Sequence, residues 1–149
     1  MLVVNSYLAP STVHGIGLFA AEPIAAGSVV WKFNRHIDKI FKKEIFLAIC
    51  KEVDLCSLRH LLNSSYKRGD RYFYLTDNAR FINHSTEHDN VAFTDDFTEV
   101  AHRDIGAGEE LLENYLLAYD ESDFFFQELV NPDPYLYLNT LYLPRQSHA

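Results

Sequence analysis

Short strand-like runs separated by turns are the feature that most limits what this chain can fold into. The predicted strands, rich in β-branched and aromatic residues, cover residues 2–8, 28–33, 72–75, 91–93 and 98–101. Asp95-Asp96 and Gly106-Ala107-Gly108 supply turns beside the last of them. Many short strands with few long elements predict a β-rich fold with α additions, in the α+β class.

One stretch, residues 38–65, has a different period and is predicted to be a helical insertion. Its apolar residues fall at helical spacing, at Phe41, Ile45, Phe46, Ile49 and Val53. The helix is expected to break near Asp54 and to resume over residues 58–62. We interpret this segment as a helix that covers the core.

Length and composition favour one domain over residues 1–149. Of the 149 residues, 48% are hydrophobic and 14% aromatic. Two domains of this total length would each be short of core. The two cysteines, Cys50 and Cys56, lie six apart in the predicted helix and do not share a face. Free thiols are therefore expected, with no disulfide and no metal site.

The net charge of −8 argues against direct nucleic-acid binding, which needs a basic patch. An acidic surface can attract a basic peptide, or it can serve solubility alone, and charge does not choose between the two. No segment is apolar enough to span a bilayer, and residues 1–5 lack a signal-peptide pattern. A cytoplasmic location without a membrane partner is expected; nuclear and secreted locations, and the oligomeric state, stay open.

Three segments combine glycine or polar residues in ways that can carry chemistry: residues 14–21 (HGIGLFAA), 78–85 (NARFINHS) and 107–115 (AGEELLENY). The paired Gly15 and Gly17 let backbone amides approach a ligand closely, although an ordinary turn explains them equally well. Asn83 and His84 can bond a ligand or their own loop. A lone Tyr115 is most often a packing residue. Read singly, none of the segments assigns a function.

Taken in order, the three segments resemble the SET domain family. Residues 15–20 (GIGLFA) look like its opening Gly-x-Gly-Leu-Phe-Ala motif, residues 80–85 like Arg-Phe-x-Asn-His-Ser, and residues 108–115 like Gly-Glu-Glu-Leu-x-x-x-Tyr. The resemblance covers roughly residues 10–116. The lack of reader or targeting segments is similar to stand-alone viral or bacterial members.

The resemblance implies a SET-domain (β-clip) fold of short sheets, in which the last two motifs meet in a pseudoknot-like crossing. It also implies a protein lysine methyltransferase that uses S-adenosylmethionine (S-adenosyl-L-methionine) and acts on a basic, lysine-containing protein such as a histone or ribosomal protein. Tyr115 would be the catalytic tyrosine. The implied cofactor-binding residues are Gly15, Ile16, Gly17, Leu18, Arg80, Phe81, Asn83 and His84.

The expected chemistry suits a narrow apolar channel. A lysine must lose its proton before it attacks, and burial in such a channel disfavours the ammonium. Oxygen acceptors at the channel mouth would align the amine with the methyl group. The predicted lining is Tyr72, Tyr74, Phe93, Tyr115 and Phe125, and residues 117–149 are predicted to be a C-terminal arm that closes the channel.

The sequence departs from the family pattern in one loop. Thr86 stands where the family has Cys, and Asp89-Asn90 replaces Pro-Asn with one extra residue before it. Two alternatives therefore stay open. The first is a catalytically weak or inactive SET-like module that binds peptide or cofactor. The second is a structural β-clip domain, because residues 21–27 resemble turns of non-enzymatic relatives; it leaves the pairing of Asn83 with Tyr115 unexplained.

Overall fold

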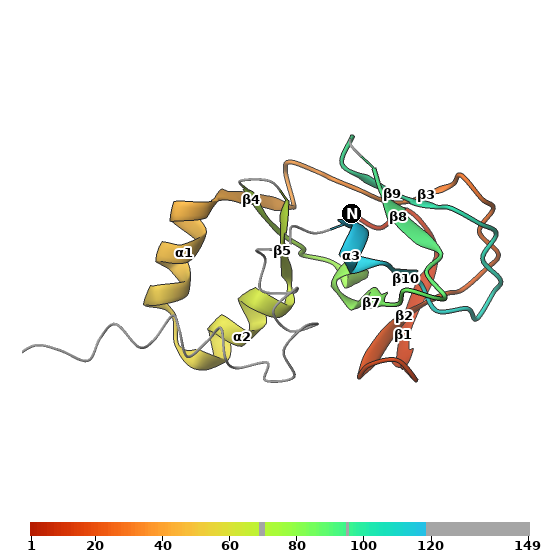
Figure 1. Cartoon of the computed structure of the whole chain (residues 1–149), viewed down its shortest axis with the longest axis horizontal. Helices are drawn as coiled ribbons and strands as arrows, with labels where there is room; N and C mark the ends of the chain where they lie inside the picture. Colours follow the sequence, from red (N-terminus) through yellow and green to blue (C-terminus); the bar gives the residue numbers. More distant parts are fainter. Residues whose placement is uncertain (69–70, 95, 119–149) are drawn as a thin grey trace, which may run out of the picture. The chain divides into compact units, whose positions relative to one another are not determined.

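The computed structural model describes residues 1–68, 71–94 and 96–118, which form two compact units. The first unit combines residues 1–39 with residues 75–118, and the described part of the second is residues 40–74. Short strands make up most of the described elements (Figure 1), and the predicted β-rich α+β class is confirmed. The prediction of a single domain over residues 1–149 stays a prediction.

Five strands of the first unit form one mixed sheet. Their order is β3 (Val29–Lys32), β9 (Thr98–Ala101), β8 (Val91–Phe93), β10 (Leu112–Glu113) and β7 (Asn83–His84). Strands β3, β9 and β8 pair antiparallel, whereas β10 is parallel to both β8 and β7. Figure 1 shows these strands from β3 in orange to β10 in blue.

Strand β10 creates the pseudoknot-like crossing expected of the fold. A loop joins β7 to β8, and β10, from later in the chain, lies between those two strands. At the two ends of the loop, Ser85 N–H donates to the Glu113 carbonyl at 3.1 Å and Asn90 N–H to the Leu112 carbonyl at 2.9 Å. The fully buried Asn90 side chain also accepts from Leu112 N–H at 2.9 Å and donates to the Glu110 carbonyl at 2.8 Å. One asparagine thus fastens the crossing.

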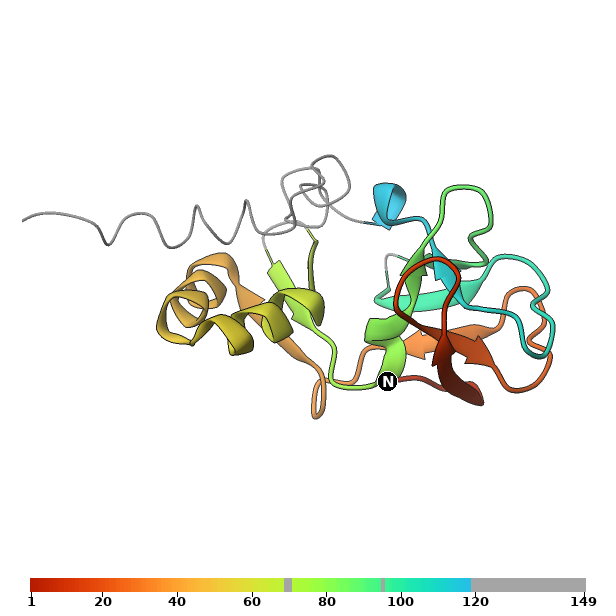
Figure 2. The same ribbon diagram turned by 90° about the horizontal axis from the view of Figure 1, so that it is seen from below.

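Strands β1 (Ser6–Pro10) and β2 (Ile16–Ala20) form a hairpin, drawn in red in Figure 2. Its second strand also bonds the segment that leads into β10. Leu111 N–H donates to the Leu18 carbonyl at 2.7 Å, and Ala20 N–H to the Glu109 carbonyl at 2.9 Å. The first glycine motif is therefore largely strand and not a free loop.

The first predicted strand was placed too early in the sequence. Residues 2–8 were expected to be a strand, but β1 begins at Ser6. Leu2 makes an isolated bridge to Trp31, and Val3 N–H donates to the Val30 carbonyl at 2.9 Å. The first residues thus lie along β3, and only the following ones are available for the hairpin.

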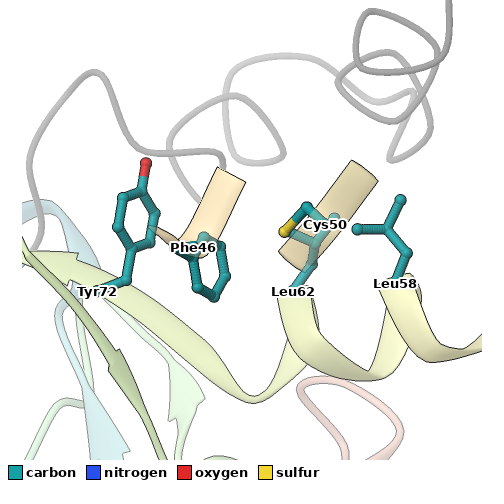
Figure 3. Packing of buried hydrophobic residues seen from close by; sticks show 5 residues of the cluster. All are labelled: Phe46, Cys50, Leu58, Leu62 and Tyr72. Carbon is teal, nitrogen blue, oxygen red and sulfur yellow. The ribbon is translucent and has the colours of Figure 1, made fainter. Parts of the chain in front are cut away.

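The second unit packs two helices, α1 (Lys43–Glu52) and α2 (Leu55–Asn63), with a three-stranded sheet. The sheet order is β4 (Lys39–Lys42), β6 (Arg71–Tyr74) and β5 (Ser65–Arg68). Its core cluster consists of Phe46, Cys50, Leu58, Leu62 and Tyr72, shown in Figure 3. The Phe46 and Tyr72 rings stack with centroids 4.3 Å apart.

The helical segment was predicted to start too early, although its break was predicted at the right residue. Residues 39–42 form β4, because their backbone groups pair with β6 and this pairing outweighs the helical period. The break near Asp54 is confirmed: its carboxylate caps α2 by accepting from Ser57 N–H at 2.9 Å. Both cysteines are free thiols as expected, and burial raises the pKa of Cys50 to about 11.

Residues 119–149, which contain Phe125 and nearly all of the predicted C-terminal arm, lie outside the described residues. In the part of the chain that is described, no helix has the length and apolar character needed to cross a membrane.

Candidate functional site

The three motifs meet at the side chains of Asn83 and Glu110. Asn83 Nδ2 donates to Glu110 Oε1 at 2.9 Å, and to the carbonyls of His14 at 3.0 Å and Ile16 at 3.2 Å. The Ser11 hydroxyl donates to the other carboxylate oxygen of Glu110 at 2.9 Å. One hydrogen-bond network therefore joins the hairpin, β7 and the approach to β10.

Gly17 is required by this network. A Cβ at Gly17 would lie 2.2 Å from Glu110 Oε1 and 3.1 Å from Ser11 Cβ, and Glu110 cannot withdraw without giving up its bond to Asn83. Gly15 serves a different purpose. Its φ of +51° suits glycine, and no atom lies within 4 Å of the position that a Cβ would take. The space beside Gly15 is open, whereas that beside Gly17 is filled.

The other two residues of the predicted glycine motif differ in exposure. Ile16 is 50% exposed, whereas Leu18 is fully buried and its carbonyl is already bonded to Leu111 N–H. A ligand of this motif would therefore meet the backbone at Gly15 and Ile16. Leu18 packs in the core and supports them.

Arg80 and Phe81 end a short 3₁₀ turn, η1 (Asn78–Phe81). Asp77 caps this turn, because its Oδ1 accepts from Ala79 N–H at 3.0 Å. The Arg80 guanidinium lies 4.9 Å from the centroid of the Phe81 ring. Both side chains are half-buried, directly before β7.

His84 and Tyr115 hold each other in place. Tyr115 N–H donates to His84 Nδ1 at 3.0 Å, and the two rings lie 5.1 Å apart. The Glu113 carbonyl is 3.3 Å from the same nitrogen, but the shorter bond requires Nδ1 without a proton, so the neutral ring carries its proton on Nε2. Burial lowers the pKa of His84 and favours this neutral form.

The hydroxyl end of Tyr115 is anchored as well. Its hydroxyl donates a hydrogen bond to the Ile82 carbonyl. Tyr115 begins the short helix α3 (Tyr115–Ala118) and is half-buried. Backbone and hydroxyl contacts thus fix the tyrosine at both ends.

The predicted channel residues fall into different parts of the chain. Phe93 lies in β8 of the first unit, as part of the sheet that leads to Tyr115, and its ring is 6.4 Å from that of Trp31. Tyr72 and Tyr74 belong to the second unit. There Tyr72 packs in the core cluster.

Tyr74 Oη lies 2.9 Å from His60 Nε2, also within the second unit. Phe125 is outside the described residues. A channel lined jointly by Tyr72, Tyr74, Phe93 and Phe125 stays a prediction.

The departures from the family pattern lie on the outside of the loop between β7 and β8. Thr86 is exposed, and Asp89 Oδ2 lies 2.9 Å from His102 Nε2. The buried Asn90, which keeps the family's residue type, still bonds β10. The loop therefore departs from the family pattern at its outer residues and keeps the buried contact of Asn90 with β10.

Sequence reasoning missed four residues around the site: Ser11, Glu99, Glu110 and Glu113. Ser11 and Glu110 are 99 positions apart, so no local pattern connects them. Glu99 and Glu113 are each 3% exposed. Burial, and then the negative charge of Glu113, raise the pKa of Glu99 well above its ordinary value. No group of His, Cys, Asp and Glu within residues 1–68, 71–94 and 96–118 is arranged to hold a metal ion.

The sequence profile of the SET domain matches residues 15–116. This match covers more than half of the chain and includes all three motifs. The chain therefore belongs to the SET domain family. No curated protein sequence matches it significantly.

Solved structures of SET methyltransferases share the fold over 75% of this chain. One is the ctPRC2 complex with H3K27me3 and H3K27M, at 23% identity and a TM-score of 0.57. Another is a humanized mutant of the Chaetomium thermophilum Polycomb Repressive Complex 2 bound to the inhibitor GSK126, at 23% identity and a TM-score of 0.54. The third is a candidate histone methyltransferase of Plasmodium falciparum, at 17% identity and a TM-score of 0.50.

The chain spans very different shares of these proteins. It covers 14% and 15% of the two Polycomb chains and 93% of the Plasmodium falciparum chain. At such identities the likeness shows the fold.

Proposed function

We propose that this chain transfers a methyl group from S-adenosylmethionine to a lysine side chain of a protein. The observation that carries the proposal is the anchoring of Tyr115 at both ends, by His84 Nδ1 and by the Ile82 carbonyl. A tyrosine fixed in this way offers its hydroxyl oxygen as a preorganised acceptor. Family membership supports the assignment as a methyltransferase, and the anchored Tyr115 supports the proposal that it is catalytically active.

The residues of the glycine motif and β7 suit the cofactor. Asn83 Oδ1 accepts no hydrogen bond from the described residues, so it is available to the ammonium of the cofactor's amino-acid part. The open space beside Gly15 and the exposure of Ile16 would let a ligand approach the backbone at these two residues. Arg80 and Phe81, directly before β7, are proposed to complete the site. When bound, the cofactor supplies a methyl group attached to a positively charged sulfur.

The chain's own part in the reaction is to favour the neutral form of the amine and to orient it. Lysine has an ordinary pKa of ~10.4, and apolar surroundings favour its neutral, nucleophilic form. The Tyr115 oxygen would accept a hydrogen bond from the amine and so align its lone pair with the methyl group. Phe93, with Tyr72, Tyr74, Phe125 and the arm at residues 117–149, is proposed to form the channel around the lysine stem.

A basic protein is the proposed substrate. The net charge of −8 would steer a lysine-rich segment toward the chain. The ctPRC2 structure contains H3K27me3 and H3K27M, so histone H3 is the first substrate to test, followed by other basic proteins.

The test is mass spectrometry after incubation with isotopically labelled S-adenosylmethionine. Purified chain is added to histone H3 and, separately, to a cell lysate, with calorimetry of cofactor binding alongside. We expect cofactor binding and labelled methyl groups on lysine in at least one protein. Absence of both binding and label in folded protein would refute the proposal.

A binding module without transfer is the second candidate, and one observation favours it. Asn83 Nδ2 already donates to three protein oxygens, so only the oxygen side of this amide is left for a ligand. A module of this kind would bind S-adenosylmethionine and leave every lysine in histone H3 and in the lysate unlabelled. The same experiment therefore separates the two candidates.

A further inference from the structure

The hairpin of β1 and β2, drawn in red in Figure 2, has one strand at the edge of its sheet. Just beyond the two ends of β1, Ala21 N–H donates to the Asn5 carbonyl and Ser11 N–H to the Gly15 carbonyl, both at 2.9 Å. In an antiparallel pair, residues that exchange bonds alternate with residues whose backbone groups point away from the partner strand. The residues at even positions of β1 therefore direct their backbone groups away from β2.

Three residues of β1 have this outward orientation: Ser6, Leu8 and Pro10. On the opposite edge of the hairpin, the outward groups of β2 are used, since the Leu18 carbonyl accepts from Leu111 N–H. Within residues 1–68, 71–94 and 96–118, the outward N–H groups of Ser6 and Leu8 and the carbonyls of all three residues have no hydrogen-bond partner. The outer edge of β1 is thus open to another strand.

The side chains around this edge are apolar and uncharged. Tyr7 is 45% exposed and Leu8 is 38% exposed. Residues 1–21 contain no Asp, Glu, Lys or Arg, although these types make up 23% of the chain. Proteins usually protect an exposed strand edge from other strands with charged side chains, lysine above all. Here the protection is limited to Pro10, which has no N–H to offer.

We propose that the outer edge of β1 pairs antiparallel with β1 of a second copy of this chain, with Leu8 on the two-fold axis. The inference goes beyond the proposed function and does not depend on methyl transfer. In this register each Leu8 N–H donates to the carbonyl of Leu8 of the partner subunit, and each Ser6 N–H to the carbonyl of Pro10 of the partner subunit. Proline therefore falls where its missing N–H leaves only the Ser6 carbonyl without a donor.

A second copy suits this edge for two reasons. The edge is self-complementary, because the same groups donate and accept on both sides, as a two-fold interface requires. The net charge of −8 makes two copies repel each other on average, and residues 1–21 are a stretch where they can approach without facing like charges. Pairing would cover Leu8 and would place Tyr7 opposite Ala9 of the partner subunit.

Pairing at this edge would also affect the candidate site. Strand β2 begins at Ile16, whose carbonyl accepts from Asn83 Nδ2 together with the carbonyl of His14. A partner strand on β1 would therefore hold the glycine motif in place in both copies.

Analytical ultracentrifugation of the wild-type chain over a range of concentrations tests the pairing. We expect a dimer fraction that rises with concentration, with a Kd on the order of 100 μM or tighter, as suits a small interface. Leu8→Lys places like charges on the axis and should weaken the dimer by at least about tenfold. Leu55→Lys makes the same change at a leucine of the second unit that is 48% exposed, and should leave the Kd unchanged.

Three results would overturn the inference. A wild-type chain that stays monomeric up to ~1 mM would leave the edge of β1 to solvent or to an extended peptide of another protein. A dimer with the same Kd in Leu8→Lys would form through another surface. Equal weakening by Leu8→Lys and Leu55→Lys would be an effect of net charge alone.

Leu8→Cys tests the register even if Leu8→Lys does not fold, because it keeps the edge uncharged. Bonded residues of an antiparallel pair have Cα atoms ~5.5 Å apart, a distance that a disulfide spans. After mild oxidation, we expect peptide mass spectrometry to find a disulfide between the two introduced cysteines. The exposed Cys56 of the wild-type chain gives the background of random cross-links. Disulfides through Cys56 alone would overturn the pairing of Leu8 with Leu8.

Discussion

The two units of this chain are stabilised in different ways. The second unit has a core of Phe46, Cys50, Leu58, Leu62 and Tyr72, all from neighbouring stretches of sequence. The first unit also buries apolar residues, such as Leu18 and Leu111, but its sheet in addition buries Asn90, Glu99 and Glu113 and joins segments far apart in sequence by hydrogen bonds. Burial of apolar side chains stabilises the folded state, whereas burial of polar groups destabilises it unless they are fully hydrogen-bonded.

Because of this difference, substitutions in the two units are expected to have different effects. Substitutions in the apolar core of the second unit, apart from the proposed channel residues Tyr72 and Tyr74, should change stability and leave the cofactor affinity of folded molecules unchanged. Substitutions in the first unit should change cofactor or substrate binding, sometimes with a gain in stability, because functional sites retain costly polar groups. The following variants test whether the two units respond to substitution in these different ways.

The largest expected loss of stability comes from Phe46→Ala. Phe46 is 1% exposed and stacks on Tyr72, so its removal leaves a cavity and should lower the free energy of unfolding by about 3–5 kcal/mol. Urea denaturation measures this, and calorimetry should find unchanged S-adenosylmethionine affinity in the folded fraction. Ile45→Ala, at a neighbouring residue that is 52% exposed, is the control and should change stability by less than about 0.5 kcal/mol. A large loss of S-adenosylmethionine affinity in folded Phe46→Ala would contradict the expected difference between the two units.

Asn90→Ala should be next in size. It removes the side-chain bonds to Leu112 N–H, the Glu110 carbonyl and Glu109 Oε1, and leaves buried groups unpaired. We expect a loss of about 2–3 kcal/mol in urea denaturation. Asn5→Ala, an exposed asparagine that bonds Glu22, is the matched control and should cost little. Similar small losses in both variants would show that Asn90 does not fasten the crossing.

Gly17→Ala tests the hydrogen-bond network of Asn83 and Glu110, which leaves no room for a side chain at Gly17. The new Cβ would displace Glu110 from Asn83, with a cost of about 2 kcal/mol and roughly tenfold weaker cofactor binding. Gly106→Ala is the control, because its nearest neighbour, Glu109 Oε2, would be 3.8 Å from the Cβ. Calorimetry and thermal unfolding measure both. Equal behaviour of the two variants would argue against a role for the network in cofactor binding.

The smallest effect is a pH dependence at Glu99. Its pKa is higher in the folded chain than in the unfolded chain, so folded protein retains a proton that the unfolded chain has released. Stability from this group is therefore lost as pH rises above the ordinary glutamate value. Glu99→Gln does not titrate there, and its advantage over wild type should grow between pH 5 and pH 8, on the order of 1 kcal/mol. Thermal unfolding across this range measures it, with Glu87→Gln as control; an advantage that shrinks with pH would contradict the assignment.

The sequence predicted those elements whose pattern is local. Strands β8 and β9 were predicted to the residue, because short β-branched and aromatic runs are bounded by turns. Strand β10 was not predicted. It has two residues and exists because β7 and β8 flank it, which no local pattern records.

The candidate site could be proposed from the sequence only where a motif contains its residues. Asn83, His84 and Tyr115 are identified by resemblance to the family, but the contacts of Asn83 with Glu110, of Glu110 with Ser11 and of Tyr115 with His84 depend on tertiary structure. Glu99 was missed for a different reason. Alternation in a strand assigns polar side chains to solvent, and here both faces of the strand are covered.

The most direct test of the central claim is Tyr115→Phe, with cofactor binding and methyl transfer measured on the same preparation. Tyr7→Phe, at a tyrosine that is 45% exposed, serves as the control. We predict that Tyr115→Phe binds S-adenosylmethionine like wild type and lowers kcat by about 100-fold or more, since it removes one preorganised acceptor. Unchanged kcat in a Tyr115→Phe variant that still binds the cofactor would contradict the assignment of Tyr115 as the catalytic residue.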